Sequence, residues 1–329
     1  MRVVIVGMRG LGVETAKNLC LAGPSQVSIY DPTMTAIADL GSNFYLTEGD
    51  VGKKTRAEGS ITKLQELNPY VKTDIIADEA TLKAYIDAGG VGVVCQTELV
   101  INGTFVDPEA LDTHCRTKNT GYISTATLGS WGYCFVDYGP KHVCFDQDGE
   151  QTKQFIVTMI EKGAEKTKII VHEDKRHTYQ EGDHVVLREV EGMVEMNETA
   201  PLKIVSTGKF HFEVELDSTG FSDYVRQGVV ENQKVPTNIE FLSWTDCFKN
   251  PVKCSTFGML EVPDLAKFGR SEQLHCALWG IQKFLAANGR YPATADVDAC
   301  KALANDFMKA NGESGMTVEI EDEVFKKAV

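Results

Sequence analysis

The chain lacks an excess of positive charge and has no long hydrophobic run. It carries 33 Lys and Arg residues against 47 Asp and Glu residues, a net charge of −14. That surplus repels a phosphate backbone, so we expect no nucleic-acid partner. No apolar run approaches the roughly 20 residues that span a bilayer, and no signal-peptide pattern precedes the first predicted strand. We therefore expect no membrane partner and a cytoplasmic and nuclear location.

Cysteine pairs with metal-binding or redox spacing are also missing. The nine cysteines are scattered and none forms a C-x-x-C pair, which argues against a disulfide framework and a structural zinc site. Five of them fall on predicted helix faces or strands, where thiols are typically buried and inert. These five are Cys20, Cys95, Cys134, Cys144 and Cys300. The sequence predicts no catalytic residue and no metal site.

What is present divides into three compositional segments. Residues 1–150 alternate short apolar strands with helical stretches, which predicts a Rossmann-like α/β layer with a mostly parallel sheet. Residues 151–237 contain short β-rich runs separated by Gly, Asp and Asn turns, which predicts an inserted small antiparallel barrel. From 264 onward, apolar residues recur at helical spacing, which predicts a partial helical bundle.

A glycine loop opens the chain between a predicted strand and a helix. Its glycines are Gly7, Gly10 and Gly12, and Asp31 closes the next strand about 20 residues on, the layout of a dinucleotide or ATP site. In such a loop the middle position lets the backbone approach the phosphates, but here it is Arg9. We therefore expect a vestigial loop that packs a strand on a helix and binds no cofactor, with Asp31 an exposed acid at the strand end.

The same loop leaves a second hypothesis open, an NAD(P)-dependent Rossmann-fold oxidoreductase. The glycines and Asp31 support it. Arg9 and the lack of an evident hydride-transfer site argue against it.

Motifs in all three segments resemble the N-terminal portion of the ubiquitin-activating enzymes. They occur in the same order along nearly the whole chain, which is more specific than a glycine loop alone. The stretches are Gly7-Met8-Arg9-Gly10-Leu11-Gly12-Val13-Glu14, Asn43-Phe44-Tyr45-Leu46, Glu66-Leu67-Asn68, Gly182-Asp183, Glu189-Val190-Glu191-Gly192-Met193, Gly220-Phe221-Ser222-Asp223-Tyr224-Val225-Arg226 and Ala266-Lys267-Phe268.

The resemblance implies a domain organisation. Residues 1–150 and 238–263 would form the inactive adenylation half, with 151–237 inserted as the first catalytic-cysteine half-domain. Residues 264–329 would open a helical bundle that is truncated. The active adenylation half and the catalytic-cysteine domain would follow the last residue, so we expect an incomplete sequence.

The resemblance also implies that this half makes no adenylate. Active halves hold phosphates with a motif resembling S-N-L-N-R-Q-F, a second cation and a later magnesium-binding acid. Here Asp39, Gly41 and Ser42 replace the two asparagines and the arginine, and Gln96-Thr97 replaces the acid. Arg56 falls near the second cation. Losing two charge-assisted hydrogen bonds of roughly 1.5–3 kcal/mol each weakens ATP binding by about 10² to 10⁴-fold.

For function, the resemblance implies a scaffold and part of a ubiquitin-docking surface. The intact enzyme would use ATP and magnesium to adenylate the ubiquitin C-terminus and then form a cysteine thioester. Its partners would be ubiquitin, the active adenylation half of its own chain and, through the missing domains, ubiquitin-conjugating enzymes. An activating enzyme for another ubiquitin-like protein is the remaining alternative.

Overall fold

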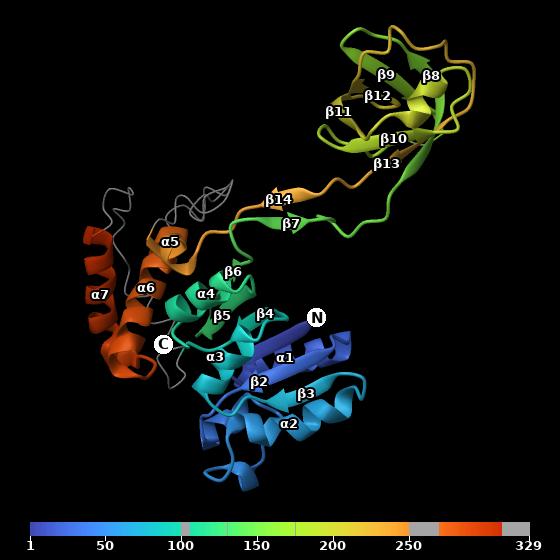
Figure 1. Ribbon diagram of the computed structural model, residues 1–329. Helices are drawn as coiled ribbons and strands as arrows, with labels where there is room; N and C mark the ends of the chain where they lie inside the picture. Colours follow the sequence, from blue (N-terminus) through green and yellow to red (C-terminus); the bar gives the residue numbers. More distant parts are fainter. Residues whose placement is uncertain (100–105, 130, 175, 250–269, 311–329) are drawn as a thin grey trace. The chain divides into compact units, whose positions relative to one another are not determined.

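The computed structural model describes residues 1–99, 106–129, 131–174, 176–249 and 270–310 (Figure 1). The chain divides into two compact units. One consists of Met1–His142 together with Glu240–Val329, and the other of Val143–Ile239.

A six-stranded sheet forms the centre of the first unit, in the order β3-β2-β1-β4-β5-β6. The strands are β1 (Arg2–Val6), β2 (Gln26–Tyr30), β3 (Lys72–Ile75), β4 (Val91–Gln96), β5 (Gly121–Leu128) and β6 (Trp131–Asp137). All neighbouring pairs are parallel except β5 and β6. The chain order reverses between β1 and β4, and a crevice for ligands is typical of the carboxyl ends of strands at such a point.

Alternation along β1 divides its side chains between two cores. Val3 and Ile5 pack with α1 (Gly10–Ala22) and α2 (Arg56–Leu67) on one face of the sheet. Val4 and Val6 belong to the core on the other face, to which α3 (Glu79–Asp87) and α4 (Pro108–Thr117) contribute. Because successive strand residues point to opposite faces, a continuous apolar run marks a strand covered on both sides.

Local signals explain where the helices near the sheet begin. Thr55 accepts a hydrogen bond from the Glu58 backbone N–H, while the Glu58 side chain accepts from the Thr55 N–H, a capping box for α2. Asp107 caps α4, which starts with Pro108. Two short 3-10 helices, η1 (Ile37–Gly41) and η2 (Glu48–Asp50), lie between β2 and α2.

Three further helices complete the described part of this unit. They are α5 (Trp244–Lys249), α6 (Arg270–Asn288) and α7 (Val297–Ala310), and η6 (Thr294–Asp296) precedes α7. A methyl group on Gly280 would lie 2.4 Å from the Cys300 carbonyl oxygen, so the glycine permits α6 and α7 to approach closely. Their apolar side chains join the core on the α3 and α4 side of the sheet. No described helix combines the length and hydrophobicity needed to cross a bilayer.

The second unit is a small closed barrel in the strand order β10-β11-β12-β9-β8-β13. Its strands are β8 (Gln154–Glu161), β9 (Lys166–Val171), β10 (His184–Arg188), β11 (Leu202–Thr207), β12 (His211–Glu215) and β13 (Val229–Asn232), with η3 (Val194–Glu198) between β10 and β11. All the pairs are antiparallel. The aromatic side chains of Phe155, Tyr179 and Phe212 meet His177 in its core. A two-stranded sheet of β7 (His142–Cys144) and β14 (Thr237–Ile239) adjoins the unit boundaries.

The predicted fold class is confirmed: a mostly parallel α/β sheet, a small antiparallel barrel and helices towards the C-terminus. The helical prediction for 264–329 is described only over 270–310, and the remainder lies outside the described residues.

Candidate functional site at the glycine loop

The glycine loop packs too tightly to accept side chains at two of its glycines. Gly7 has φ +96, and a Cβ there would lie 2.9 Å from the Glu98 Cβ. A Cβ on Gly12 would lie 2.0 Å from the Gly7 carbonyl oxygen. The loop is therefore held against α1 and against the segment that follows β4.

Arg9 occupies the N-cap position of α1 but caps nothing with its side chain. Its Nε lies 2.8 Å from Glu98 Oε1 and 3.9 Å from Asp39 Oδ1. Its side chain keeps 44% of its surface exposed, and its guanidinium lies 5.5 Å from the ring centre of Tyr291. The sequence predicted a side chain at the phosphate position, and the structure shows that this side chain is directed towards Glu98 and Asp39. The guanidinium pairs with acids of the same chain.

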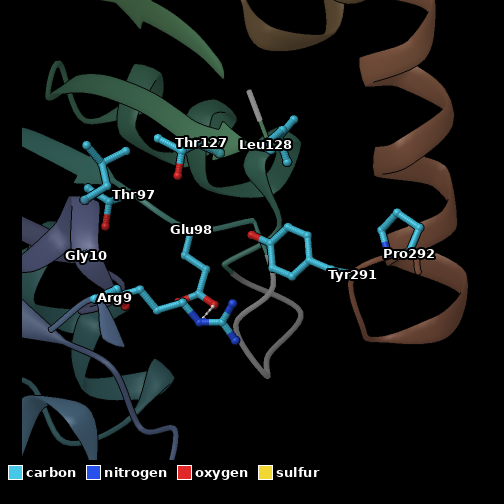
Figure 2. A pocket seen from close by; sticks show the side chains of 12 residues that line it. Arg9, Gly10, Thr97, Glu98, Thr127, Leu128, Tyr291 and Pro292 are labelled. Atoms are coloured by element: carbon cyan, nitrogen blue, oxygen red, sulfur yellow. Dashed lines mark ion pairs between the residues drawn. The ribbon is translucent and has the colours of Figure 1, made fainter. Parts of the chain in front are cut away.

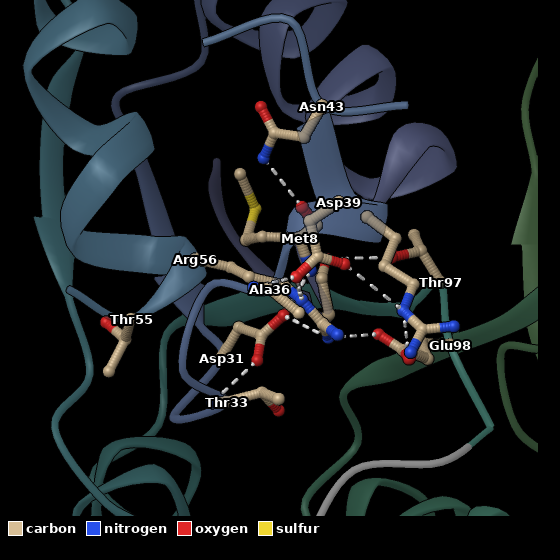
Figure 3. Close-up of polar contacts among 12 residues, drawn as sticks. Met8, Asp31, Thr33, Ala36, Asp39, Asn43, Thr55, Arg56, Thr97 and Glu98 are labelled. Carbon is tan, nitrogen blue, oxygen red and sulfur yellow. Dashed lines mark hydrogen bonds and ion pairs between the residues drawn. The ribbon is translucent and has the colours of Figure 1, made fainter. Parts of the chain in front are cut away.

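Asp31 is buried, with 1% of its surface exposed, so the expectation of an exposed strand-end acid is wrong. Its Oδ2 accepts a hydrogen bond of 2.8 Å from the Met8 N–H, and its Oδ1 accepts one of 2.9 Å from the Thr33 N–H. The Asp31 carboxylate ties the end of β2 to the loop after β1 (Figure 3). Sequence reasoning missed this because the hydrogen bond from Met8 joins segments brought together only by strand pairing.

Arg56, at the start of α2, is the most deeply buried cation of the site, at 3% exposure. Its guanidinium lies 2.9 Å from Asp39, 3.2 Å from Glu98 and 3.4 Å from Asp31. Burial lowers the pKa of Arg56, but these carboxylates outweigh burial and raise it above the usual value. The arginine therefore stays charged, and these three ion pairs all join it to acids of the same chain.

Glu98 is the site residue that the sequence analysis missed. It follows β4 by two residues and is 2% exposed. Burial raises the pKa of Glu98 to about 7, although Arg9 and Arg56 act in the opposite direction. Gln96-Thr97 stands where the resemblance places an acid, and Glu98 follows one residue later along the same carboxyl edge of the sheet.

The five charged side chains form one cluster, shown in part in Figure 3. Two guanidinium groups face three carboxyl groups, so the cluster carries one net negative charge when all are ionised. Its members are Arg9, Arg56, Asp31, Asp39 and Glu98. Asn43 supports it from the side, since its Nδ2 donates to the Met8 carbonyl and to Ser60.

A pocket of about 320 Å³ opens beside this cluster (Figure 2). The glycine loop, Thr97 and Glu98 line one part, residues 126–129 at the end of β5 another, and Tyr291 and Pro292 between α6 and η6 a third. The Tyr291 hydroxyl accepts a hydrogen bond of 3.4 Å from the Leu99 N–H. Burial raises the pKa of Tyr291 to about 12, so this hydroxyl remains protonated.

The cysteines differ in burial. Of the eight cysteines within the described residues, five are buried, and burial raises the pKa of Cys20 and Cys300 to about 11 and that of Cys95 to about 12. Cys134 is exposed and Cys144 half-buried, so the expectation that these two are buried is wrong. Within the described parts of the chain, no group of three or more His, Cys, Asp or Glu side chains is arranged to hold a metal ion.

The family model "Ubiquitin-activating enzyme E1 FCCH domain" matches residues 164–234, within the barrel unit. The model "Ubiquitin-activating enzyme E1 four-helix bundle" matches residues 235–308. Ubiquitin-activating enzyme E1 1 of Arabidopsis thaliana is 33% identical over 98% of this chain. This chain is homologous to the ubiquitin-activating enzyme E1.

Other relatives lead to the same result. The ubiquitin-like modifier-activating enzyme 1 of Homo sapiens is 34% identical over 92% of the chain, and a Candida albicans enzyme is 34% identical over 88%. The chain spans only 27% to 29% of these three relatives' lengths, and it corresponds to a part of an E1. A crystal structure of E. coli MccB with ATP is 19% identical, with a TM-score of 0.34 over 39% of this chain and 37% of that one. The predicted resemblance is confirmed by the two family models and the ubiquitin-activating relatives.

Proposed function

We propose that this chain is the non-catalytic N-terminal part of a ubiquitin-activating enzyme. In this assignment, residues 1–150 with 238–263 are the inactive adenylation half, 151–237 the first catalytic-cysteine half-domain and 264–329 the start of the helical bundle. The observation that carries the proposal is the homology along 98% of the chain to an E1. The FCCH match to residues 164–234 supports the assignment of the barrel.

The proposed role is that of a scaffold and docking surface. The intact enzyme would adenylate the ubiquitin C-terminus with ATP and magnesium, form a cysteine thioester and pass ubiquitin to conjugating enzymes. This chain would support the active adenylation half, and the exposed loops of its barrel would contribute to ubiquitin docking, because loops on a rigid scaffold commonly form recognition surfaces. Such an enzyme would act in the cytoplasm and nucleus.

The charge cluster supports the proposed absence of catalysis. ATP brings several negative charges, whereas the cluster beside the glycine loop already has more carboxyl groups than guanidinium groups. Both arginines that could face phosphate are engaged by acids of the chain. The oxygens of Asp31 are likewise engaged, which leaves them unavailable to a ribose. No observation favours the oxidoreductase alternative.

Two measurements test the proposal. The first is ATP–pyrophosphate exchange by the purified chain with ubiquitin, ATP and magnesium, alongside an intact ubiquitin-activating enzyme as the positive control. We expect exchange only in the control, and ubiquitin-dependent exchange by the chain alone would overturn the proposal.

The second measurement is NMR titration of ¹⁵N-labelled ubiquitin with the chain. We expect saturable shifts on one face of ubiquitin. These shifts should be absent with a variant in which Asp217 and Thr219, which are hydrogen-bonded to each other in an exposed turn of the barrel, are both replaced. A second ubiquitin-like protein serves as the specificity comparison. Preferential binding of that protein would favour the alternative of an activating enzyme with another substrate, and binding of neither would contradict the docking role.

A further inference from the structure

The amino end of α1 faces the pocket without any of the usual partners. Gly10 and Leu11, in the first turn, line the pocket. No side chain caps the helix, and its first turn contains no acidic residue. A free helix N-terminus of this kind favours a negative charge, because its N–H groups and dipole point outward.

An independent observation concerns Glu98, an acid that lines the same pocket. The carboxylate of Glu98 is held from both sides, with Oε1 2.8 Å from Arg9 Nε and Oε2 3.2 Å from Arg56 Nη1. Two guanidinium groups that each engage one oxygen of the same acid form an arrangement suited to recognising a carboxylate or phosphate ligand. Here the acid belongs to the chain and is 2% exposed.

The position of Glu98 in the sheet shows which site its carboxylate occupies. The residue follows β4, across the point where the strand order reverses, and its backbone N–H and Cβ lie against Gly7. That crevice is where phosphates bind in open α/β sheets. Figure 2 shows the Glu98 side chain extending to Arg9, with the Tyr291 ring beside them.

We propose that the Glu98 carboxylate is an internal anion that replaces a ligand phosphate at the glycine loop, with Tyr291 covering it. The site would be an anion site occupied by its own chain. This inference extends the proposed non-catalytic function and rests on it only for its biological meaning, since the anion site can be tested without ubiquitin. With Glu98 ionised the cluster has a net charge of −1, and with Glu98 neutral the remaining Arg9, Arg56, Asp31 and Asp39 balance one another.

The test uses inorganic pyrophosphate as the probe and isothermal titration calorimetry of the full chain near pH 8. Glu98→Gln keeps the shape of the side chain and removes its charge. Glu98→Asp keeps the charge and is the matched control. We expect the Gln variant to bind pyrophosphate at least about 10-fold more tightly than the wild type or the Asp variant, because one repulsive charge within a few Å is removed.

A double variant identifies the groups that bind the probe. Adding Arg9→Gln to Glu98→Gln should remove the gain, since the exposed guanidinium would then be missing. A purely structural ion pair predicts something different: altered thermal stability in the Gln variant and no change in affinity. If the Gln variant has the near-UV circular dichroism of the wild type and still binds no more tightly, the proposal is wrong.

Sulfate affinity of the wild-type chain, measured as a function of pH, provides a second and independent test. Sulfate is the probe because its charge is constant between about pH 6 and 8. The charged groups facing Glu98 are Arg9 from the loop, Arg56 from α2, Asp31 after β2 and Asp39 in η1. Tyr291, between α6 and η6, also faces Glu98, and the Glu98 charge contributes to the raised pKa of Tyr291. Burial raises the pKa of Glu98 to about 7.

Sulfate affinity of the wild type should therefore increase several-fold as the pH falls from about 8 to 6. The Glu98→Gln variant, which has nothing to protonate at this position, should bind sulfate with little change over the same range. A wild-type affinity that stays constant would overturn the proposal even if the Gln variant failed to fold. Neither result depends on ubiquitin binding or exchange, so failure here leaves the proposed function to its own tests.

Discussion

Replacing Asp112 by Asn should change how the stability of the α/β unit depends on pH. Asp112, on α4, accepts a 2.8 Å hydrogen bond from the Trp244 N–H at the start of α5 and is 1% exposed. Burial raises the pKa of Asp112 to about 7, and the neighbouring Asp137 carboxylate adds to the rise, while the Trp244 N–H and Arg116 oppose it. The acid thus holds its proton in the fold at pH values where the unfolded chain has lost it.

The direction and size of the change in the free energy of unfolding follow from proton linkage. Between about pH 4 and 7 the folded state binds one proton more than the unfolded state, so the free energy of unfolding falls as the pH rises. A rise in pKa from 3.8 to about 7 corresponds to a loss of roughly 4 kcal/mol, at about 1.4 kcal/mol per pH unit. The Asn side chain carries no charge at any pH and can donate a hydrogen bond to Asp137. We therefore expect Asp112→Asn to be more stable than the wild type by about 1–4 kcal/mol near pH 8, and equal within about 1 kcal/mol near pH 4.5.

Urea unfolding followed by tryptophan fluorescence measures this difference. Trp131, Trp244 and Trp279 all lie within the first unit, so the signal reports that unit rather than the barrel. Glu165→Gln removes one negative charge at an exposed position, as Asp112→Asn does at a buried one. It is the control and should match the wild type at both pH values. Equal destabilisation of the Asn variant at pH 4.5 and 8 would refute the reasoning, because it would mean that Asp112 is ionised throughout.

Three further predictions concern packing and thiol exposure. Gly12→Ala should destabilise the first unit by about 1–3 kcal/mol or more, because the added Cβ would lie 2.0 Å from the Gly7 carbonyl oxygen. Gly41→Ala is the control, since a Cβ there would meet open space. In the same urea titration its stability should stay within about 1 kcal/mol of the wild type. Phe212→Ala should destabilise the barrel by about 3–5 kcal/mol, measured by hydrogen exchange of barrel amides, since this fully buried ring contacts two other aromatic groups; an unchanged exchange pattern would contradict its core position. Ellman's reagent should react with Cys134 before any buried thiol of the native chain, and simultaneous reaction of all thiols would contradict the assigned burial.

The fold class could be read from the sequence because its signals are local. The apolar run of β1, the glycine turn and the apolar spacing of α6 each depend on residues close together in the chain. The barrel was predictable from short strands separated by turn residues, although its closure in the order β10-β11-β12-β9-β8-β13 was not. That order depends on pairing between distant strands.

The charge cluster was harder to predict for the same physical reason. Arg9 and Asp31 were recognised from the loop pattern, but burial of Asp31 depends on the Met8 N–H, 23 residues away. Glu98 carried no motif. Its role depends on the parallel pairing of β1 with β4, which sets it against Gly7.

The sequence alone determined the order of α/β layer, barrel and helices, and the family resemblance, since periodicity and ordered motifs are properties of the linear chain. The tertiary structure decided which charges face one another. Whether an arginine is free for a ligand or neutralised by an acid of its own chain depends on distances of a few Å between segments that only folding brings together.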